Sequence, residues 1–136
     1  MITLSDFAGA WQIARRIEDA NELANGSFEG TATFTKVNDT RLSYYETGLL
    51  HLSNGHKMQG ERGYVWQQQG DLISVLFTDG RPFHEFDLRD RSSAEHLCDP
   101  DVYRVSYDFA KWPAWQSCWR VTGPRKDYVM TTSYSR

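Results

Sequence analysis

Two charged residues stand inside aromatic stretches of the sequence. Glu46 follows Tyr44 by two positions, and Arg62 precedes Tyr64 by two. Alternate side chains of a strand point to the same face, so both charges are predicted to face the same interior as the tyrosines. A buried charge is costly unless it is paired. We therefore predict a Glu46–Arg62 ion pair inside the protein, which either fixes the strand register or contacts a ligand.

Several aromatic side chains are predicted to share this inward face. They are Tyr44, Tyr64, Trp66, Tyr103 and Tyr128. A few phenol groups set in an apolar wall provide directed hydrogen bonds, which is the composition of small-molecule sites. The alternative is that the rings simply fill a small barrel. Both interpretations stay open at this point, because a sequence does not measure a cavity volume.

Histidine and cysteine offer a different chemistry. His84, His96 and Cys98, with Asp101, would supply the four ligands of a zinc site. The spacing matches no strong metal signature, so we predict histidines satisfied by hydrogen bonds, with no metal and no cofactor. Two alternatives are a haem with His84 or His96 as axial ligand, and a Cys98 nucleophile with His84 as its base.

Two cations follow a rigid Gly-Pro turn near the end of the chain, Arg125 and Lys126. The planar guanidinium of an arginine can bind a carboxylate or a phosphate through two hydrogen bonds. These residues are predicted to lie at the rim of the protein, where they would bind an anionic group of a ligand. The alternative is that Asp127 and other nearby acids neutralise them.

The elements that position these residues are predicted from alternation with period two, which recurs from end to end. After a short turn at residues 5–8 and a first strand from Trp11, strands are predicted at 28–34, 42–50, 62–66, 72–77, 83–88, 103–109, 115–121 and 128–134. Turn residues separate these segments at 25–26, 38–39, 53–55, 69–71, 79–80, 99–100 and 123–124. About nine strands with short connections predict an all-β, antiparallel up-and-down barrel, since closure removes exposed sheet edges.

Composition limits the classes of partner. The 136 residues predict a single domain, 1–136, and the net charge of −3 with no basic stripe argues against nucleic acid. No stretch reaches the roughly 20 apolar residues of a membrane span, and the start of the chain does not look like a secretory signal. Two cysteines are consistent with a reducing cytoplasm. The aromatic loop 111–115 is interpreted as a lid, as a patch for a partner such as a second copy, or as packing on the outer wall.

Two sets of motifs resemble known families. Gly9-x-Trp11 resembles the first lipocalin motif, and in these calycin barrels the Trp lies across the closed end under an Arg of the last strand, here Arg136. Nearly the whole chain also resembles a bacterial and fungal domain family of unknown function with a lipocalin-like barrel. The matching motifs are Tyr44-x-Glu46-x-Gly48, Arg62-x-Tyr64-x-Trp66, Phe77-x-Asp79-Gly80-Arg81-x-Phe83-His84, His96-x-Cys98-x-x-Asp101-x-Tyr103 and Gly123-Pro124-Arg125-Lys126-Asp127-Tyr128. The resemblance implies a fold and no reaction.

These patterns favour a binding protein that holds a small aromatic or amphipathic molecule, including anionic ones, in a barrel. The predicted ligand-binding residues are Tyr44, Glu46, Arg62, Tyr64, Trp66, His84, His96, Tyr103, Arg125, Lys126 and Tyr128. An enzyme is the first alternative, because Tyr44, Glu46, Arg62 and Tyr64 suffice for acid–base chemistry if burial raises the pKa of Glu46. A haem-binding barrel is the second.

Overall fold

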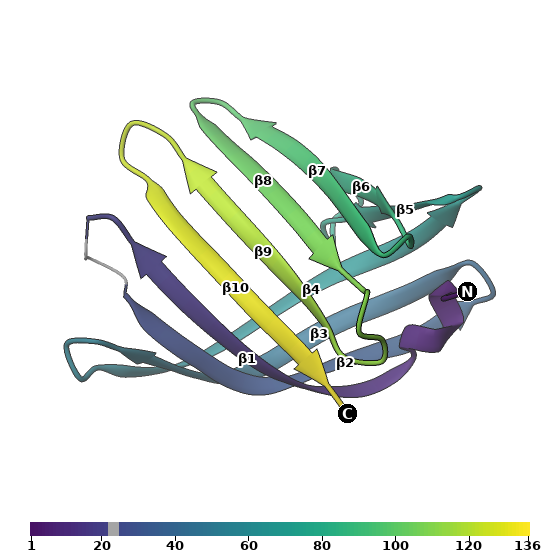
Figure 1. The fold of residues 1–136 in the computed structure, drawn as a ribbon, viewed down its shortest axis with the longest axis horizontal. Helices are drawn as coiled ribbons and strands as arrows, with labels where there is room; N and C mark the ends of the chain where they lie inside the picture. Colours follow the sequence, from purple (N-terminus) through teal and green to yellow (C-terminus); the bar gives the residue numbers. More distant parts are fainter. Residues whose placement is uncertain (22–24) are drawn as a thin grey trace.

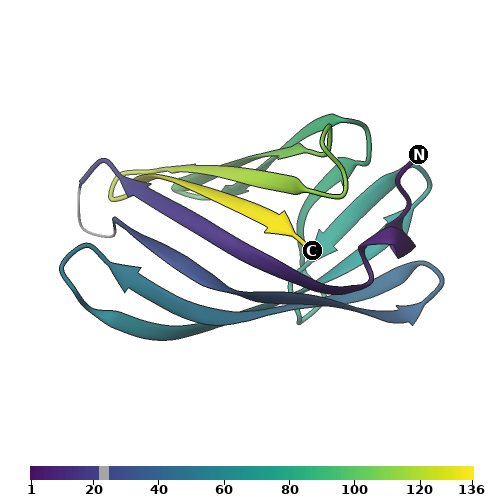
Figure 2. The same cartoon turned by 60° about the horizontal axis from the view of Figure 1, so that its bottom comes forward.

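A computed structural model, which describes residues 1–21 and 25–136, shows one antiparallel sheet curled into a barrel (Figures 1 and 2). The elements are η1 (Leu4–Phe7), β1 (Gly9–Asp19), β2 (Gly26–Asn38), β3 (Arg41–Leu52), β4 (Lys57–Gln69), β5 (Leu72–Leu76), β6 (Pro82–Asp87), β7 (Arg91–Cys98), β8 (Asp101–Asp108), β9 (Trp115–Thr122) and β10 (Asp127–Ser135). Their order in the sheet is β6-β5-β4-β3-β2-β1-β10-β9-β8-β7. The outer strands β6 and β7 approach each other without forming a ladder, so the barrel is nearly closed.

The predicted all-β barrel is confirmed, with ten strands in place of about nine. The additional strand is β7, whose sequence contains Ser, Glu and Arg and none of the β-branched or aromatic residues that usually mark a strand. All seven predicted turns coincide with connections between consecutive strands, and in three of them one residue (Gly26, Asn38 or Gln69) is the end residue of a strand. Gly55, Gly70 and Gly80 have positive φ angles there, a conformation that glycine adopts without steric cost.

One end of the barrel is sealed by aromatic side chains. Trp11 is fully buried, its Nε1–H donates to the Phe7 carbonyl at 2.8 Å, and the Arg136 guanidinium lies 3.9 Å from its ring centroid. Arg136 also donates to the carbonyls of Asp6 and Ala8, which ties the last strand to η1. The expectation of an arginine packed over Trp11 is therefore confirmed.

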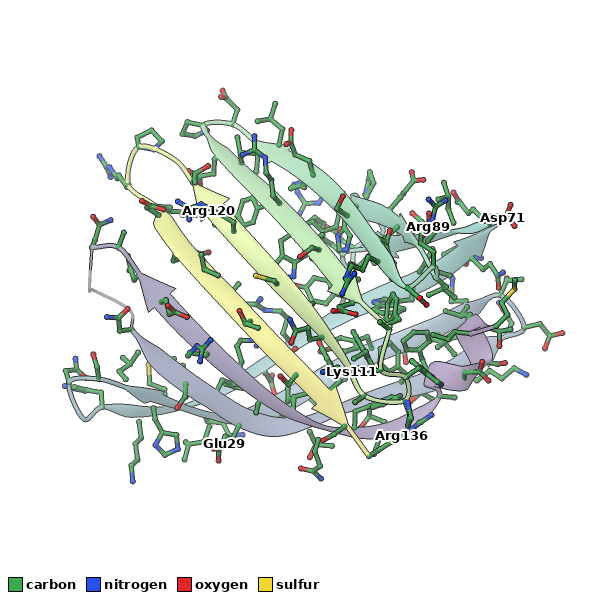
Figure 3. The ribbon with its side chains drawn as sticks, viewed as in Figure 1. Glu29, Asp71, Arg89, Lys111, Arg120 and Arg136 are labelled. Carbon is green, nitrogen blue, oxygen red and sulfur yellow. The ribbon has the colours of Figure 1, made fainter. Side chains whose placement is uncertain are left out.

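The aromatic loop 111–115 belongs to this sealed end, as Lys111 and Arg136 show (Figure 3). The ring of Trp112 lies 4.8 Å from that of Phe7 and 5.6 Å from that of Trp11. Trp112 is half-buried against the core, so the interpretations of the loop as a lid over an open mouth and as outer-wall packing are both wrong. Because Trp112 packs on Phe7, the segment between β8 and β9 lies at the sealed end of the barrel and not at the opposite end.

A row of glycines crosses the middle of the sheet. Gly30 of β2 pairs with Gly48 of β3, which pairs in turn with Gly60 of β4. A Cβ atom on Gly48 would lie 2.2 Å from the Glu29 carbonyl oxygen, so the two backbones approach more closely there than side chains permit. Glycine rows of this kind let long strands bend sharply around a barrel.

A Gly48→Ala substitution is expected to lower the free energy of unfolding by about 2 kcal/mol, because the new methyl group must push β2 and β3 apart. Chemical denaturation followed by tryptophan fluorescence would measure the loss. Thr47→Ala, the adjacent outward position, is the control and should change stability by less than about 1 kcal/mol. Equal stability of the two variants would contradict a steric role for the glycine row.

Two negative findings complete the fold. Among the described residues, no helix has the length and apolarity that a bilayer crossing requires. Cys98 is exposed, Cys118 is partly buried, and both are free thiols. The sheet ladders and the aromatic core therefore hold these strands together without a covalent link between the two cysteines.

Candidate functional site

A small cavity lies inside the barrel, next to the aromatic side chains that seal one end. Its volume is about 50 Å³, which is room for a few water molecules and far below the roughly 300 Å³ at which drug-sized pockets begin. It is lined by Arg15, Tyr44, Glu46, Arg62, Tyr64, Trp66, Val75, Phe83, His84, Tyr107, Ser117, Trp119, Met130, Thr132 and Tyr134. Side chains therefore fill most of the barrel, and what remains is a polar cavity for a small group.

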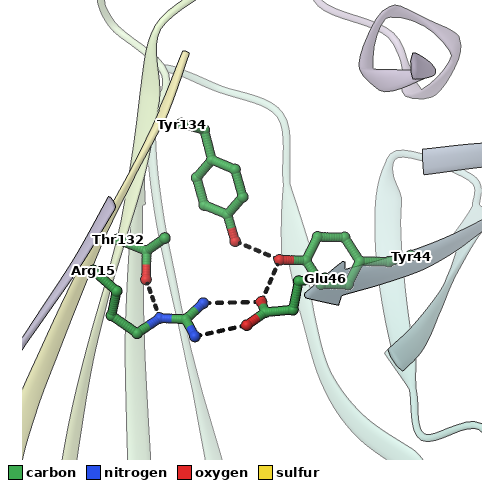
Figure 4. Close-up of polar contacts among 5 residues, drawn as sticks. All are labelled: Arg15, Tyr44, Glu46, Thr132 and Tyr134. Carbon is green, nitrogen blue, oxygen red and sulfur yellow. Dashed lines mark hydrogen bonds and ion pairs between the residues drawn. The ribbon is translucent and has the colours of Figure 1, made fainter. Parts of the chain in front are cut away.

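A buried ion pair between Arg15 and Glu46 dominates one wall of the cavity (Figure 4). Arg15 Nη1 and Nη2 donate to the two carboxylate oxygens at 2.7 and 2.9 Å, and Arg15 Nε donates to Thr132 Oγ1 at 2.7 Å. The Glu46 side chain is only 4% exposed. β1 and β3 are separated by β2, on which Arg15 pairs with Phe28 and Glu46 pairs with Ala32. Gly30, which has no side chain, lies between these two positions and leaves room for Arg15 to reach across.

The hydroxyl groups of Tyr44 and Tyr134 extend this network, and each donates its hydrogen bond toward Glu46. The Tyr44 hydroxyl donates to Glu46 Oε1 at 2.6 Å and lies 2.9 Å from the Tyr134 hydroxyl. Because the Tyr44 proton is already given to the carboxylate, Tyr134 must be the donor to Tyr44. The Tyr134 ring stacks on Trp115 at 3.6 Å, which fixes its position. Tyr134, Tyr44, Glu46, Arg15 and Thr132 are thus joined in one continuous hydrogen-bond network.

The electrostatics keep Glu46 ionised. Burial alone would raise its pKa, but the Arg15 guanidinium and the Tyr44 hydroxyl outweigh burial and hold the pKa below its usual value. Burial would likewise lower the pKa of Arg15, and Glu46 raises it instead. The enzyme alternative required burial to raise the pKa of Glu46, and this condition is not met.

The predicted Glu46–Arg62 ion pair is also wrong. The two residues are direct neighbours on β3 and β4, as expected. Arg15 nevertheless occupies both oxygens of Glu46 from the other side. Arg62 is exposed, lines the cavity, and forms no ion pair with any carboxylate of the described residues. Arg62 therefore makes no ion pair within 4 Å among the described residues, although its charge contributes to the lowered pKa of Glu46.

His84 reaches the cavity through an irregularity in β6. Val75 pairs with His84 while the next residue of β5 pairs with Pro82, so Phe83 is an extra residue in the strand. A bulge of this type redirects side chains. Phe83 and His84, although consecutive, both line the cavity. His84 Nε2 lies 2.8 Å from the Tyr107 hydroxyl.

His84 is neutral at ordinary pH. Burial, with a smaller contribution from His96, lowers its pKa to about 3. Within residues 1–21 and 25–136, no three His, Cys, Asp or Glu side chains gather closely enough to hold a metal ion. A haem would need far more space beside His84 than the 50 Å³ cavity provides. The structure thus gives no support to the haem alternative.

Three aromatic residues of the prediction lie around the mouth without lining the cavity. His96 packs 5.1 Å from Phe83, and Tyr103 lies 6.4 Å from both Phe83 and Trp119, measured between ring centroids. Tyr128 lies on the inward face of β10, two residues before Met130, which does line the cavity. These residues frame the entrance.

The two predicted rim cations, Lys126 and Arg125, have different surroundings in the structure. Lys126 pairs with Asp101 at 3.0 Å and donates to the Tyr103 hydroxyl at 3.2 Å, so it is neutralised, as one interpretation of the sequence expected. Arg125 is exposed on the β9–β10 turn and does not line the cavity. Asp127 pairs with Arg120 at 2.8 Å.

Six of the eleven predicted site residues therefore line the cavity, and several of its other lining residues were missed. The six are Tyr44, Glu46, Arg62, Tyr64, Trp66 and His84. Arg15 was missed, although the alternation Trp11, Ile13, Arg15 along β1 places it on the buried face. Tyr107 and Tyr134 follow from the same rule in β8 and β10. Their roles in ligand binding stay predictions.

Alkaline pH should weaken the fold through the buried phenols. Burial raises the pKa of Tyr134 to about 12, with Arg15 opposing the shift. Its contribution to stability is complete below the unfolded pKa of about 10 and is lost as pH rises from 10 through 12, about 1.4 kcal/mol per unit. Denaturation curves at each pH should show this decline, and Tyr134→Phe should make it less steep, with the remaining slope coming from Tyr44 and Tyr107, whose pKa values burial also raises. An unchanged slope in that variant would contradict the assignment.

Comparisons with known proteins agree with this fold. No curated protein matches the sequence. The S-type phycobiliprotein lyase CPES from Guillardia theta is similar in structure, with a TM-score of 0.66 and 10% identity over 98% of this chain and 90% of the lyase. A DUF3598 protein of unknown function from Nostoc punctiforme has the same TM-score and identity over 98% of this chain, which spans 48% of that protein. At such identities the likeness shows the fold alone.

One family model matches most of the sequence. The match extends from residue 7 to residue 136, and so includes the Gly9-x-Trp11 motif, all ten strands and Arg136. The family's function is not known, which leaves the cavity as the guide to chemistry. The chain belongs to DUF6314, a family of unknown function.

Proposed function

We propose that this protein binds a small aromatic molecule that carries an anionic group, with the anion at Arg62 and the ring in the mouth of the barrel. The observation behind the proposal is the state of Arg62. Its position on β4 faces the interior, next to Glu46 and two residues from Tyr64, and yet it has no acidic partner among the described residues. The charge of the deeper arginine, Arg15, is already paired with the Glu46 carboxylate, and its Nε donates to Thr132.

The walls beside Arg62 are suited to an aromatic ring. Phe83 stacks against Trp119 at 5.0 Å with an interplanar angle of 9°, and Tyr64 stacks against Phe83 at 5.6 Å. All three residues are only partly buried. Aromatic faces arranged beside a few polar groups are typical of small-molecule sites.

The size of the cavity sets how deeply such a ligand enters. A volume of 50 Å³ admits a substituent of a few atoms but not an aromatic ring. The ring would therefore lie among Tyr64, Phe83 and Trp119 at the mouth, and a substituent would point inward.

The test is a titration with 4-isopropylbenzoate followed by tryptophan fluorescence. Arg62→Gln should weaken binding about 10-fold or more, because one charge-assisted hydrogen-bond pair is worth about 1.5–3 kcal/mol. The uncharged amide of the same acid should bind wild type and variant equally. Higher salt should weaken binding of the acid to wild type, since Arg62 is exposed.

Arg125→Gln is the matched control. It removes the same charge from an exposed arginine that does not line the cavity. Its affinity for 4-isopropylbenzoate should stay within about 2-fold of wild type, the range expected of a distant surface charge. If Arg62→Gln and Arg125→Gln behave alike, or if the acid does not bind at millimolar concentration, the proposed function is refuted.

A further inference from the structure

One edge of the sheet has no neighbouring strand. The ladder of β4 with β3 spans residues 57–67, whereas its ladder with β5 covers only residues 65–69. Among the strands that the structure describes, none pairs with the first half of β4 on the side away from β3. This half belongs to the β3–β4 hairpin at the lower left of Figure 1, while β5 and β6 lie at the upper right. Thr78 lies against Gly63, so the free edge consists of residues 57–62.

The backbone groups of alternate residues point out of this edge. The Gln68 N–H of β4 donates to the Thr40 carbonyl, on the side of β3, and the β3–β4 register has no bulge from there to residue 57. In an antiparallel strand the direction of hydrogen bonding alternates from one residue to the next. Even-numbered residues of β4 therefore bond to β3. The N–H and carbonyl groups that point to the open side are those of Lys57, Gln59 and Glu61.

The charges on this edge are complementary to those of a second copy of the same edge. Lys57 and Glu61 are exposed, lie two residues on either side of Gln59, and form no ion pair among the described residues. If two such edges pair in antiparallel fashion about a two-fold axis at Gln59, Lys57 of each copy lies directly opposite Glu61 of the other. Opposite charges at facing positions stabilise a strand pair. An edge that is protected against pairing typically carries lysines or a proline, whereas this edge has charges of both signs and no proline.

The inner face of the edge fits the same arrangement. Met58 is 54% exposed, although it alternates with Gly60 and the cavity-lining Arg62 on the inward face of β4. Gly60 has no side chain, and a Cβ atom there would lie 3.2 Å from the Phe28 ring. In the antiparallel pairing about Gln59, Met58 of each copy lies opposite Gly60 of the other. The exposed methionine would then gain an apolar contact beside Phe28 of the second copy.

We propose that the protein forms a two-fold symmetric dimer in which the β4 edges of two copies pair through residues 57–61. The backbone groups of Lys57, Gln59 and Glu61 form the ladder between the copies, and each Lys57 forms an ion pair with Glu61 of the other copy. A two-fold contact of this kind uses the same surface on both copies, so it closes and does not extend into a filament. The ladder is short, which is typical of weak and reversible association. The contact is independent of what the cavity binds.

The mass of the protein in solution tests whether the dimer exists. Analytical ultracentrifugation distinguishes the monomer of 15.7 kDa from a particle of twice that mass. Wild type at about 100 µM should be mostly dimeric, as expected for a Kd of about 10 µM or lower. Higher salt should weaken the dimer, because the ion pairs between the copies are at the surface. A protein that stays monomeric at this concentration overturns the proposal, and its free edge would then be open to a strand of a different protein.

Exchange of the two charges tests whether this edge is the interface. Lys57→Glu and Glu61→Lys each place like charges opposite one another, so each should weaken the dimer about 10-fold or more. The two variants change the net charge in opposite directions, so a common loss cannot result from net charge. The double variant restores opposite charges and should recover the wild-type affinity. Arg125→Gln, a change at an exposed arginine outside β4, is the control and should dimerise as wild type does. Single variants that dimerise like wild type, or a double variant that stays monomeric, overturn the proposal.

A cysteine at the two-fold axis tests the register. In Gln59→Cys the two thiols lie at facing positions whose Cα atoms are about 5.5 Å apart, which is within reach of a disulfide. The exposed Cys98 is replaced by serine in all of these variants. Leu49→Cys is the matched control, because Leu49 is the exposed partner of Gln59 on β3 and its two copies would be about 14 Å apart, three strand spacings. Mild oxidation should link Gln59→Cys into a covalent dimer and leave Leu49→Cys unlinked. Linkage of Leu49→Cys to the same extent overturns the register.

Discussion

Replacing Glu46 with alanine is expected to lower the free energy of unfolding by about 3–5 kcal/mol. The substitution leaves the Arg15 guanidinium inside the barrel with its two carboxylate partners removed. It also takes the acceptor from the Tyr44 hydroxyl, which is 2.6 Å from Glu46 Oε1. A domain of this size is stable by roughly 5–15 kcal/mol, so the loss would be a large share of the total. Urea denaturation of wild type and variant measures it.

Removing both charges provides the control. The double variant Arg15→Met with Glu46→Leu buries apolar groups of similar length, and should recover most of the stability lost in Glu46→Ala. Glu61→Ala, which breaks the exposed hydrogen bond with Tyr45, should cost less than about 1 kcal/mol. If Glu46→Ala were no worse than Glu61→Ala, the buried pair would not be important for stability.

The barrel could be predicted because its signals are local. Alternation with period two and turn residues such as Asp79 and Gly80 depend only on neighbours in the sequence. Their positions agree with the strands and hairpins of the structure. β7 was missed for the same reason, since its polar sequence offers little local preference for a strand. Its half-buried positions alternate only because β8 pairs with it.

The partner of Glu46 could not be predicted from such signals. A hairpin makes Arg62 the direct neighbour of Glu46, and pairing them is the simplest expectation. The actual partner, Arg15, is two strands away, and the contact depends on the curvature of the barrel and on Gly30, which places no side chain between them on β2. Curvature results from the whole sheet. Because Arg15 is the partner of Glu46, Arg62 makes no ion pair among the described residues, which is the basis of the proposed anion site.

The number of side chains that fill the barrel interior also depends on a feature that neighbouring residues in the sequence do not reveal. Strict alternation excludes two consecutive inward side chains, but the bulge in β6 turns both Phe83 and His84 inward. The two rings occupy space that a regular strand would leave open. The sequence therefore indicated the chemical types that line the cavity, and could not indicate that its volume is only 50 Å³.

Replacing Trp11 with alanine is expected to cost about 3–5 kcal/mol, comparable to the loss of Glu46. Trp11 is fully buried and among the largest buried side chains, and its ring contacts Phe7, Trp112 and Trp115. The variant would also leave the Phe7 carbonyl without its donor and Arg136 without the ring beneath it. Trp11→Phe keeps most of the packing and should cost about half as much. Denaturation in urea compares the three proteins.

Trp11 also separates stability from binding, because it lies at the sealed end and does not line the cavity. Under conditions in which Trp11→Phe is fully folded, it should bind 4-isopropylbenzoate with an affinity within about 2-fold of wild type. Arg62→Gln should show the opposite pattern, with weakened binding and nearly unchanged stability, since an exposed, unpaired arginine contributes little to folding. A large loss of affinity in Trp11→Phe would mean that packing at the sealed end affects binding at the mouth of the barrel, and that the filled interior rearranges when a ligand binds.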